Sequence, residues 1–264
     1  MSDELLIEIE NHVAILTLNR PTLYNALNET LLEELPRALT KIANDADVGC
    51  VVITGAGKAF CSGGDVNVQV AEAKHASKSS EERMDDLRRW VEAARLLHEM
   101  PKPTIAMVNG VAAGAGMSMA LSCDMRIAGK SARMTTAFAK VAFPGDYGGH
   151  YFLLRLVGAA KARELYFTSE VLDSAAIEKL GLANKIVADE DLRKETMELA
   201  TKLGNGPRVA WRYMKQNMKV AETGTLSDVF DSECFGIRRC RETEDHKEAA
   251  FAFKEKRPPV FKGR

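Results

Sequence analysis

The sequence of 264 residues predicts an α/β fold followed by a helical C-terminal part. Apolar runs of strand length alternate with segments whose apolar residues recur at helical spacing, a pattern typical of α/β proteins. Two of these runs lead directly into turns rich in glycine and alanine. From about Asp189 onward, one helical pattern follows another. We therefore expect two parts, residues 1–190 and residues 191–264, the second being a helical subdomain.

The N-terminal region begins with two short strands. Residues 5–9 and 13–18 are apolar runs separated by a turn at Asn11-His12. The run Asn28-Glu29-Thr30 then carries the polar residues that favour a helix start. Leucines recur at helical spacing behind it, which predicts a helix before the next strand, at residues 50–54.

The middle of the chain contains both polar and strongly apolar segments. Residues 74–86 hold serines and charges and few apolar side chains, which indicates a surface segment that is either mobile or the entry to a helix. An amphipathic helix is expected over residues 87–100, and strands over residues 104–108 and 125–128. Four helices are expected in the C-terminal part, at residues 192–203, 207–221, 225–241 and 244–254.

Composition limits the class of protein. Lys+Arg 36 against Asp+Glu 37 gives a net charge of -1, so we expect neither a nucleic acid nor a membrane as partner. The five cysteines are scattered and form no Cys-x-x-Cys pair, which argues for free thiols and against a disulfide framework or a zinc site. The acidic residues at the start do not match a signal peptide, and no apolar run is long enough to span a membrane. We expect a cytoplasmic protein.

The loop Asn109–Ser118 carries the strongest functional signal. It joins the strand at residues 104–108 to a buried helix, so backbone N–H groups without partners gather at the start of that helix. These groups and the helix dipole can hold negative charge, as in half of an oxyanion hole. The loop is not a dinucleotide-binding fingerprint, because Gly114-Ala115-Gly116 is not followed by the third glycine. A packing turn made of small residues remains the alternative.

A second turn of small residues follows the strand at residues 50–54. Its beginning, Gly55-Ala56-Gly57-Lys58-Ala59, has neither the spacing nor the final hydroxyl of a phosphate-binding loop. At its end, Asp65 is placed to cap a following helix. Two such loops, each offering an N–H group, suit the binding of one carbonyl oxygen at two points.

Three motifs occur in order along the chain: Leu18-Asn19-Arg20-Pro21 with Asn25-Ala26-Leu27, the run Ala59–Asp65, and the loop 109–118. Together they resemble the enoyl-CoA hydratase/isomerase (crotonase) superfamily, from about Leu6 to Lys262. The resemblance implies a spiral of ββα units whose helical tail packs subunits into trimers or dimers of trimers. It also implies an acyl-CoA thioester as substrate, as in fatty acid metabolism. No cofactor is implied beyond the coenzyme A of that substrate, and no metal, nicotinamide or flavin.

The resemblance also implies roles for particular residues. The backbone N–H groups of Gly64 and Ala115 would bind the thioester carbonyl oxygen. Typical hydratases place two glutamates where this chain has Ser118 and Phe138, and neither residue is a general base, so hydration by two glutamates is disfavoured. Asp146 matches an aspartate of relatives that shift double bonds. A single carboxylate suits this proton transfer, and an apolar wall such as Phe138 would raise its pKa.

Other roles for these residues stay open. Asp146 could instead cap the helix that follows it, and Ser118 could be a packing residue rather than a contact to substrate or water. Tyr147 is a candidate wall of the substrate pocket. His150 is more typical of a surface or interface position at a helix start. Cys61 has no basic partner in its motif that would make it a nucleophile.

Contacts with coenzyme A follow from the resemblance as well. Arg20 and Ala26 match residues that line the entrance for coenzyme A. Phe253 and Lys256, at the end of the chain, match residues that reach the adenine and the phosphates, often from a neighbouring subunit; a basic, solvated tail is the alternative. Four residues of the turn that follows the strand at residues 50–54 are further expected to bind coenzyme A: Ser62, Gly63, Gly64 and Asp65.

We therefore expect an isomerase that stabilises a thioester enolate with Gly64 and Ala115 and shifts a double bond through Asp146. Hydration of a 2-enoyl-CoA, with water held by Ser118, His150 or backbone groups, is the first alternative. Hydrolysis or displacement with Asp146 as nucleophile is the second. A CoA-binding or RNA-associated protein without turnover is the third.

Overall fold

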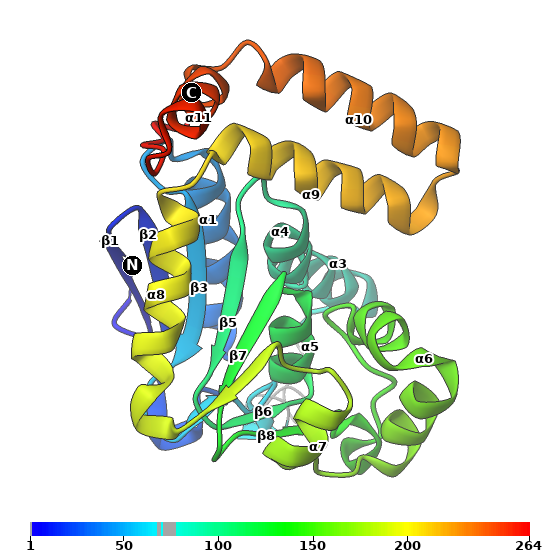
Figure 1. Cartoon of the computed structure of the whole chain (residues 1–264). Helices are drawn as coiled ribbons and strands as arrows, with labels where there is room; N and C mark the ends of the chain where they lie inside the picture. Colours follow the sequence, from blue (N-terminus) through cyan, green and yellow to red (C-terminus); the bar gives the residue numbers. More distant parts are fainter. Residues whose placement is uncertain (1, 68–69, 71–77) are drawn as a thin grey trace.

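The protein is described by a computed structural model that covers residues 2–67, 70 and 78–264 (Figure 1). A larger sheet has the strand order β1-β2-β3-β5-β7-β9, and a smaller one has the order β4-β6-β8. Only the β1–β2 pair is antiparallel among the described strands. The strands are β1 (Leu5–Glu10), β2 (Val13–Leu18), β3 (Cys50–Gly55), β4 (Ala59–Cys61), β5 (Thr104–Val108), β6 (Val111–Ala113), β7 (Met125–Gly129), β8 (Arg133–Thr135) and β9 (Lys185–Val187).

Successive strands alternate between the two sheets. β3, β5 and β7 lie in the larger sheet, and the strands that follow them, β4, β6 and β8, pair in the smaller one. β6 leads directly into α5 and β8 leads through η2 into α6, so two strands and a helix repeat. The predicted α/β class and the expected spiral of ββα units are confirmed. The described helices are η1 (Pro21–Leu23), α1 (Glu29–Asn44), α3 (Ser80–Trp90), α4 (Glu92–Glu99), α5 (Ala115–Ser122), η2 (Phe138–Val141), α6 (Gly149–Thr168), α7 (Ser174–Lys179), η3 (Asp189–Asp191), α8 (Leu192–Gly204), α9 (Arg208–Thr223), α10 (Leu226–Cys240) and α11 (Glu244–Glu255).

Both faces of the larger sheet are buried. On β3, Val51 and Ile53 belong to the main core, which also contains side chains of α1, α4 and α5. The alternate residues Cys50 and Val52 point to the other face, where Leu192 of α8 covers them. A strand that is covered on both faces appears in the sequence as a continuous apolar run. For this reason β3 and β5 can be predicted from the sequence.

Helix starts follow their capping residues. Asn28 accepts a hydrogen bond from Leu31 N at 3.1 Å, which confirms the predicted start of α1. The helix expected over residues 87–100 differs from the structure, because α3 already begins at Ser80. Ser79 and Glu82 form a capping box there, and the helix is interrupted at Val91 before α4. Residues 74–77 of the predicted surface segment lie outside the described residues.

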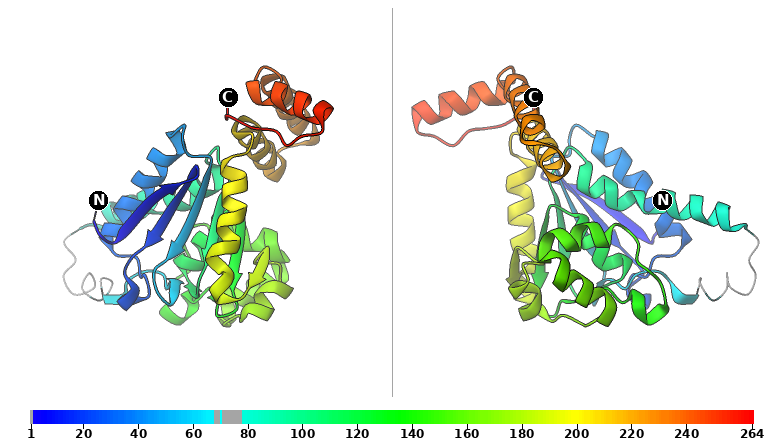
Figure 2. Two further views of the ribbon diagram at one scale, coloured as in Figure 1. Left: turned by 60° about the vertical axis from the view of Figure 1, so that its left-hand side comes forward. Right: turned by 90° about the vertical axis from the view of Figure 1, so that its right-hand side faces the viewer.

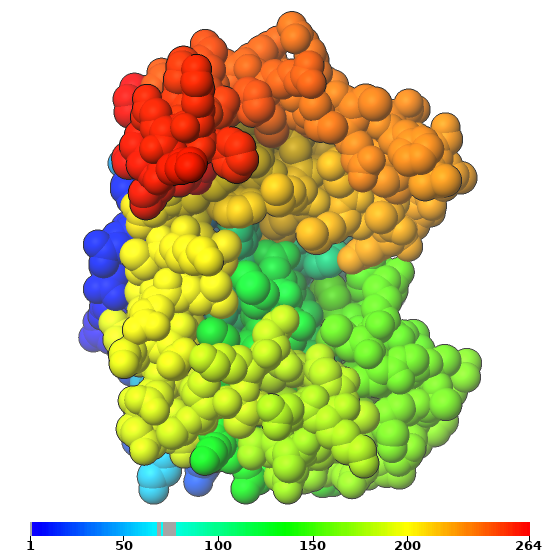
Figure 3. Space-filling model, viewed as in Figure 1, coloured from blue at the N-terminus to red at the C-terminus, as the bar shows by residue number. Residues whose placement is uncertain are grey.

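The C-terminal helices have two different settings. α8 packs on the larger sheet, whereas α9, α10 and α11 project from the body of the molecule, and α9 and α10 lie side by side (Figures 1 and 2). The expected division between residues 190 and 191 falls within η3, just before α8, and stays a prediction. Between α9 and α6 the surface is hollowed (Figure 3). Among the described residues, no helix is long and apolar enough to cross a membrane.

Candidate active site

The first loop of the site follows β4. Gly63 has a φ of 96°, a left-handed conformation that favours glycine. Its carbonyl accepts a hydrogen bond from Leu27 N at 2.8 Å, and Asp65 N donates to Leu27 O at 3.0 Å. These two bonds fix the backbone on either side of Gly64.

The second loop lies directly against the first. Gly114 turns the chain from β6 into α5 with a φ of 53°, and its N–H donates to Thr135 O at 3.1 Å. A Cβ atom built on Gly63 would lie 3.6 Å from Ala115 N, so the two loops are in contact at this point. A Cβ atom on Gly116 would overlap the carbonyl oxygen of Cys61, so only glycine allows this approach of α5 to β4.

Two backbone amides of these loops have no acceptor within the described part of the chain. Neither Gly64 N nor Ala115 N donates any of the loop and turn hydrogen bonds there. Ala115 is the first residue of α5, where an N–H group has no partner in its own helix. The site therefore offers two donors to a ligand, at positions where the loops touch.

Asp146 is carried by an irregular loop between η2 and α6. Gly145, Tyr147 and Gly148 all have positive φ, with values of 124°, 50° and 71°. Asp146 Oδ1 is buried and has no hydrogen-bond partner among the described residues. Burial raises the pKa of the Asp146 carboxyl from 3.8 to about 6.

The alternative role of Asp146 as a helix cap is wrong. The residue that caps α6 is Gly148, without a side-chain hydrogen bond. Asp146 contributes only its main-chain carbonyl, which accepts from Gly149 N at 3.1 Å. The Oδ1 atom of the carboxylate is buried, and the charge of Asp146 adds to burial in raising the pKa of Cys61 and Tyr166.

Tyr166 is a site residue that the sequence analysis did not identify. Its ring stacks on His150 with a centroid distance of 3.9 Å and lies parallel to Phe138 at 6.1 Å. A Cβ atom on Gly149 would overlap both the Tyr166 and the Ser118 hydroxyl groups, so the two hydroxyls lie together against the Gly149 backbone. Tyr166 follows the helix interruption at Gly158, and no sequence pattern connects it to Asp146.

The remaining candidate pocket residues lie around the same place. Ser118 is buried and its Oγ donates to Gly114 O at 3.2 Å. Phe138 is buried beside Gly114, with its ring 3.6 Å from where a Cβ atom of that glycine would lie. Tyr147 is 3% exposed, and burial is the main cause of its raised pKa.

The thiol of Cys61 is buried, whereas the side chain of His150 is exposed. The Cys61 thiol is fully buried, and burial raises its pKa to about 12, so it is not a thiolate nucleophile. His150 is exposed and stacks on Tyr166, so it supports a neighbour of Asp146. The described residues contain no group of three or more His, Cys, Asp or Glu side chains that could hold a metal ion.

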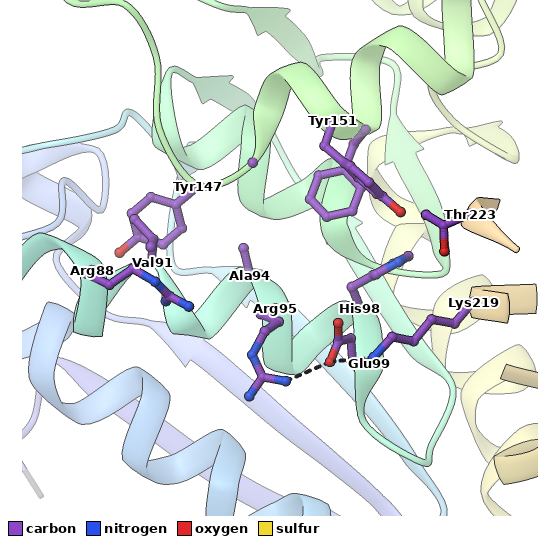
Figure 4. A pocket seen from close by; sticks show the side chains of 12 residues that line it. Arg88, Val91, Ala94, Arg95, His98, Glu99, Tyr147, Tyr151, Lys219 and Thr223 are labelled. Carbon is purple, nitrogen blue, oxygen red and sulfur yellow. Dashed lines mark hydrogen bonds and ion pairs between the residues drawn. The ribbon is translucent and has the colours of Figure 1, made fainter. Parts of the chain in front are cut away.

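A cavity of about 370 Å³ opens beside the Asp146 loop. Tyr147 and Gly148 form one side of it, and residues of α3, α4, α6 and α9 form the rest (Figure 4). Tyr147 directly follows Asp146 in the sequence, but Asp146 itself is not among the described residues that line the cavity. The side chains that line it include Arg88, Val91, Ala94, Arg95, His98, Glu99, Tyr151, Phe152, Lys219 and Thr223.

The residues expected to bind coenzyme A fall into two groups. Arg20 and Ala26 lie beside the first loop, where Arg20 forms ion pairs with Glu4 at 3.2 Å and with Asp65 at 2.9 Å. Phe253 is 88% exposed on α11. Lys256 caps that helix, and α11 lies at the opposite end of the molecule from the two loops (Figure 1). A single chain therefore does not bring the two groups together.

The chain is similar in sequence and in structure to enoyl-CoA hydratases and isomerases. The family model described as enoyl-CoA hydratase/isomerase matches residues 8–264. The chain is 34% identical over 264 residues to a 1,2-epoxyphenylacetyl-CoA isomerase of Escherichia coli, covering 100% of both chains. It is 36% identical over 261 residues to a short-chain-enoyl-CoA hydratase of Clostridium acetobutylicum, covering 97% of this chain and 96% of the relative. A crystal structure of an enoyl-CoA hydratase from Bacillus anthracis is 31% identical and superposes with a TM-score of 0.92, covering 99% of this chain and 100% of that one.

Proposed function

Because the chain belongs to the enoyl-CoA hydratase/isomerase family, we propose that it is an isomerase that moves the double bond of a 3-enoyl-CoA thioester to position 2. The family supports the coarser statement that the protein is an enzyme acting on acyl-CoA thioesters. The choice of isomerisation depends on one observation: the half-buried Asp146 carboxyl, close enough to Cys61 for its charge to act there, has an oxygen, Oδ1, that is buried without a hydrogen-bond partner among the described residues.

The thioester oxygen is held by the N–H groups of Gly64 and Ala115 in this proposal. Their availability and the contact between their loops support it. Removal of a proton next to the thioester places negative charge on that oxygen. Each donor of a preorganised oxyanion hole typically contributes roughly 3–4 kcal/mol to such a transition state.

Asp146 transfers the proton. Its carboxylate takes a proton from carbon 2, the electrons of that C–H bond form the double bond between carbons 2 and 3, and the former double bond delivers a new C–H bond at carbon 4. The same carboxyl returns the proton there, so atoms and charge balance without a second acid. A pKa of about 6 suits both halves of the transfer near neutral pH, because neither form is strongly disfavoured.

Hydration of a 2-enoyl-CoA is the second candidate, and one observation favours it. The hydroxyls of Ser118 and Tyr166 lie together near Asp146 and are able to hold a water molecule. Against it stands the absence of a carboxylate at both Ser118 and Phe138, which leaves Asp146 to act as base and acid in turn.

Self-association as a trimer or dimer of trimers completes the proposal. Large apolar side chains are exposed on the projecting helices, and such patches mark association surfaces. A neighbouring copy would also bring Phe253 and Lys256 to the coenzyme A of this chain, which one chain by itself does not do. We also propose, from the family, that the enzyme acts in the cytoplasm and in fatty acid metabolism. The exposed side chains are Leu226, Phe230, Phe235, Ile237, Phe251 and Phe253.

The test is a set of 2-enoyl- and 3-enoyl-CoA thioesters with product analysis. We expect 3-enoyl-CoA to be converted to 2-enoyl-CoA without added water, and deuterium from solvent to appear at carbon 4 at less than full level, since one carboxyl carries the proton. Formation of 3-hydroxyacyl-CoA as the main product supports hydration instead. Capture of an ester on Asp146 supports displacement and overturns the isomerase proposal.

A further inference from the structure

The guanidinium of Arg20 lies beside the loop that carries Gly64, and each of its three nitrogen atoms has a partner. Nε pairs with Glu4 at 3.2 Å, Nη1 donates to the carbonyl oxygen of Ala26 at 2.5 Å, and Nη2 pairs with Asp65 at 2.9 Å. The side chain of Arg20 is only 12% exposed, and that of Asp65 is 6% exposed. A planar guanidinium that is held by three partners has little freedom to move, so Arg20 restrains this loop.

The contact with Ala26 begins a chain of two peptide units. The Ala26 oxygen and the Leu27 N–H belong to one trans peptide unit, in which they point in opposite directions. Leu27 N donates to Gly63 O at 2.8 Å. Gly63 O and the Gly64 N–H belong to a second trans unit and again point in opposite directions. The positively charged guanidinium therefore stands at one end of a hydrogen-bonded chain, and the Gly64 N–H stands at the other.

This chain fixes the direction of the Gly64 N–H. A rotation of that peptide unit would also turn Gly63 O away from Leu27 N and break the bond between them. The peptide unit on the other side of Gly64 is held as well, because Asp65 N donates to Leu27 O at 3.0 Å and Arg20 binds the Asp65 carboxylate. The donor thus has a set direction before any ligand arrives, which is the condition for stabilising a developing charge.

The chain also strengthens the Gly64 N–H as a donor. Hydrogen bonds in series polarise one another, by roughly 10–30% per bond, and bonds from a charged donor are roughly twice as strong as neutral ones. Gly64 N is the last donor of the series and makes none of the loop and turn hydrogen bonds in the described part of the chain. The added strength is therefore available to an oxygen of the ligand.

Building on the proposed function, in which Gly64 holds the thioester oxygen, we infer that Arg20 is a positioning residue of the oxyanion hole, which aims and polarises the Gly64 N–H through the Ala26–Leu27 and Gly63–Gly64 peptide units. Arg20 acts on the charge that develops on the thioester oxygen without touching the substrate. The competing role is direct binding of a phosphate of coenzyme A, and the test separates the two.

Arg20→Lys is the variant that separates them. Lysine keeps the positive charge, but one ammonium nitrogen does not replace the fork that reaches both Ala26 O and Asp65. We expect kcat for isomerisation to fall at least about tenfold, since misdirecting one donor removes part of its contribution, while calorimetry gives an unchanged Kd for free coenzyme A. Lysine also binds phosphate, so the competing role predicts that kcat is kept. An unchanged kcat, or a Kd for coenzyme A raised about tenfold, would overturn the inference.

Glu4→Gln is the matched control. Glu4 binds the third nitrogen of the same guanidinium and lies outside the chain that leads to Gly64. Glutamine removes the charge of this partner and keeps an oxygen acceptor, so kcat and the affinity for coenzyme A should both stay unchanged. An equal fall of kcat in Glu4→Gln and Arg20→Lys would contradict a specific path through Ala26.

Amide hydrogen exchange tests the same chain without any substrate. The Leu27 and Asp65 N–H groups make the bonds on either side of Gly64. In the unliganded protein, peptides that cover residues 24–28 and 62–66 should exchange faster in Arg20→Lys than in the wild type and at the wild-type rate in Glu4→Gln, as mass spectrometry would show. Wild-type rates in Arg20→Lys would overturn the inference. Arg20→Gln carries both measurements if the lysine variant does not fold.

The outcome is distinct from that of the proposed reaction. If exchange at Leu27 and Asp65 rises in Arg20→Lys but the wild type does not isomerise 3-enoyl-CoA thioesters, the positioning of Gly64 by Arg20 stands and the isomerase proposal fails. If the wild type isomerises them and Arg20→Lys does so equally fast, the reaction stands and the role of Arg20 fails.

Discussion

Replacing Asp146 by asparagine removes one negative charge and keeps the size of the side chain. Because one oxygen of the wild-type carboxylate, Oδ1, is buried without a hydrogen-bond partner in the described part of the chain, ionisation of Asp146 destabilises the folded protein. A carboxyl group with a raised pKa in the folded protein does not lower the free energy of unfolding below its unfolded pKa, because the folded and unfolded states both bind the proton there. As the pH rises from the unfolded to the folded pKa, the free energy of unfolding falls. Here that window runs from 3.8 to about 6.

The magnitude follows from those two values. A rise of the pKa from 3.8 to about 6 corresponds to about 3 kcal/mol at pH 8, and to about half of that at pH 5, where part of the carboxyl is still protonated. Asp146→Asn should therefore be more stable than the wild type at pH 8, by about 3 kcal/mol, and the difference should shrink at pH 5. Urea unfolding at the two pH values measures this.

The same variant should lose turnover. Positioned general bases typically contribute about 10²–10⁴-fold, so isomerisation of a 3-enoyl-CoA should fall by that factor while acyl-CoA binding, which uses backbone donors, persists. In the wild type, kcat/KM should rise about tenfold per pH unit below the pKa of about 6 and then level off, because the base must be ionised.

A matched control is Asp173→Asn. Asp173 caps α7 by accepting from Ala176 N at 2.9 Å, and asparagine caps equally well, so stability and turnover should stay unchanged. Turnover above one tenth of the wild-type rate in Asp146→Asn, or lower stability of that variant at pH 8, would refute the assignment of Asp146 as a buried base.

Three further predictions concern the scaffold around these groups. Gly116→Ala places a methyl group onto the Cys61 carbonyl and should destabilise the fold by about 1–3 kcal/mol, measured by urea unfolding; an unchanged unfolding midpoint would contradict the close contact of α5 with β4. Gly149→Ala presses on the Ser118 and Tyr166 hydroxyls three residues after Asp146 and should lower kcat about tenfold or more with little change in acyl-CoA affinity, as steady-state kinetics and calorimetry would show; unchanged kcat would remove Tyr166 from the site. Asn28→Ala removes the cap of α1 and should cost about 1 kcal/mol while kcat stays the same, so a fall in kcat would show that α1 influences the reaction directly.

The sequence predicts the scaffold well where local signals are strong. Strands covered on both faces, such as β3 and β5, appear as uninterrupted apolar runs, and Asn28 marks the start of α1 by its capping side chain. The helix that was expected to begin at residue 87 begins at Ser80 instead. Most of the surface of α3 is exposed, so the polar residues after Ser79 give no apolar pattern from which its start could be predicted. Exposed helices have a weak apolar pattern, so capping residues are the better indicator there.

The candidate site is predicted less completely, for a different reason. Gly64 and Ala115 are proposed from the motifs that carry the family resemblance, since each lies in a loop that directly follows a strand in the sequence, and their role stays a prediction. Tyr166 lies beyond a helix interruption at Gly158, and only tertiary packing brings it to His150 and Phe138. The cavity likewise depends on α9, which is distant in sequence from α4, and no local pattern reports such a contact.

The backbone donors and Asp146 are held by different kinds of structure. The segments that present Gly64 and Ala115 grow out of β4 and β6, adjacent strands whose pairing sets their spacing. Asp146 is displayed by a separate stretch of left-handed backbone that no strand restrains. In the proposed reaction, a change in that stretch would therefore move the carboxyl group while β4 and β6 keep the spacing of the two donors.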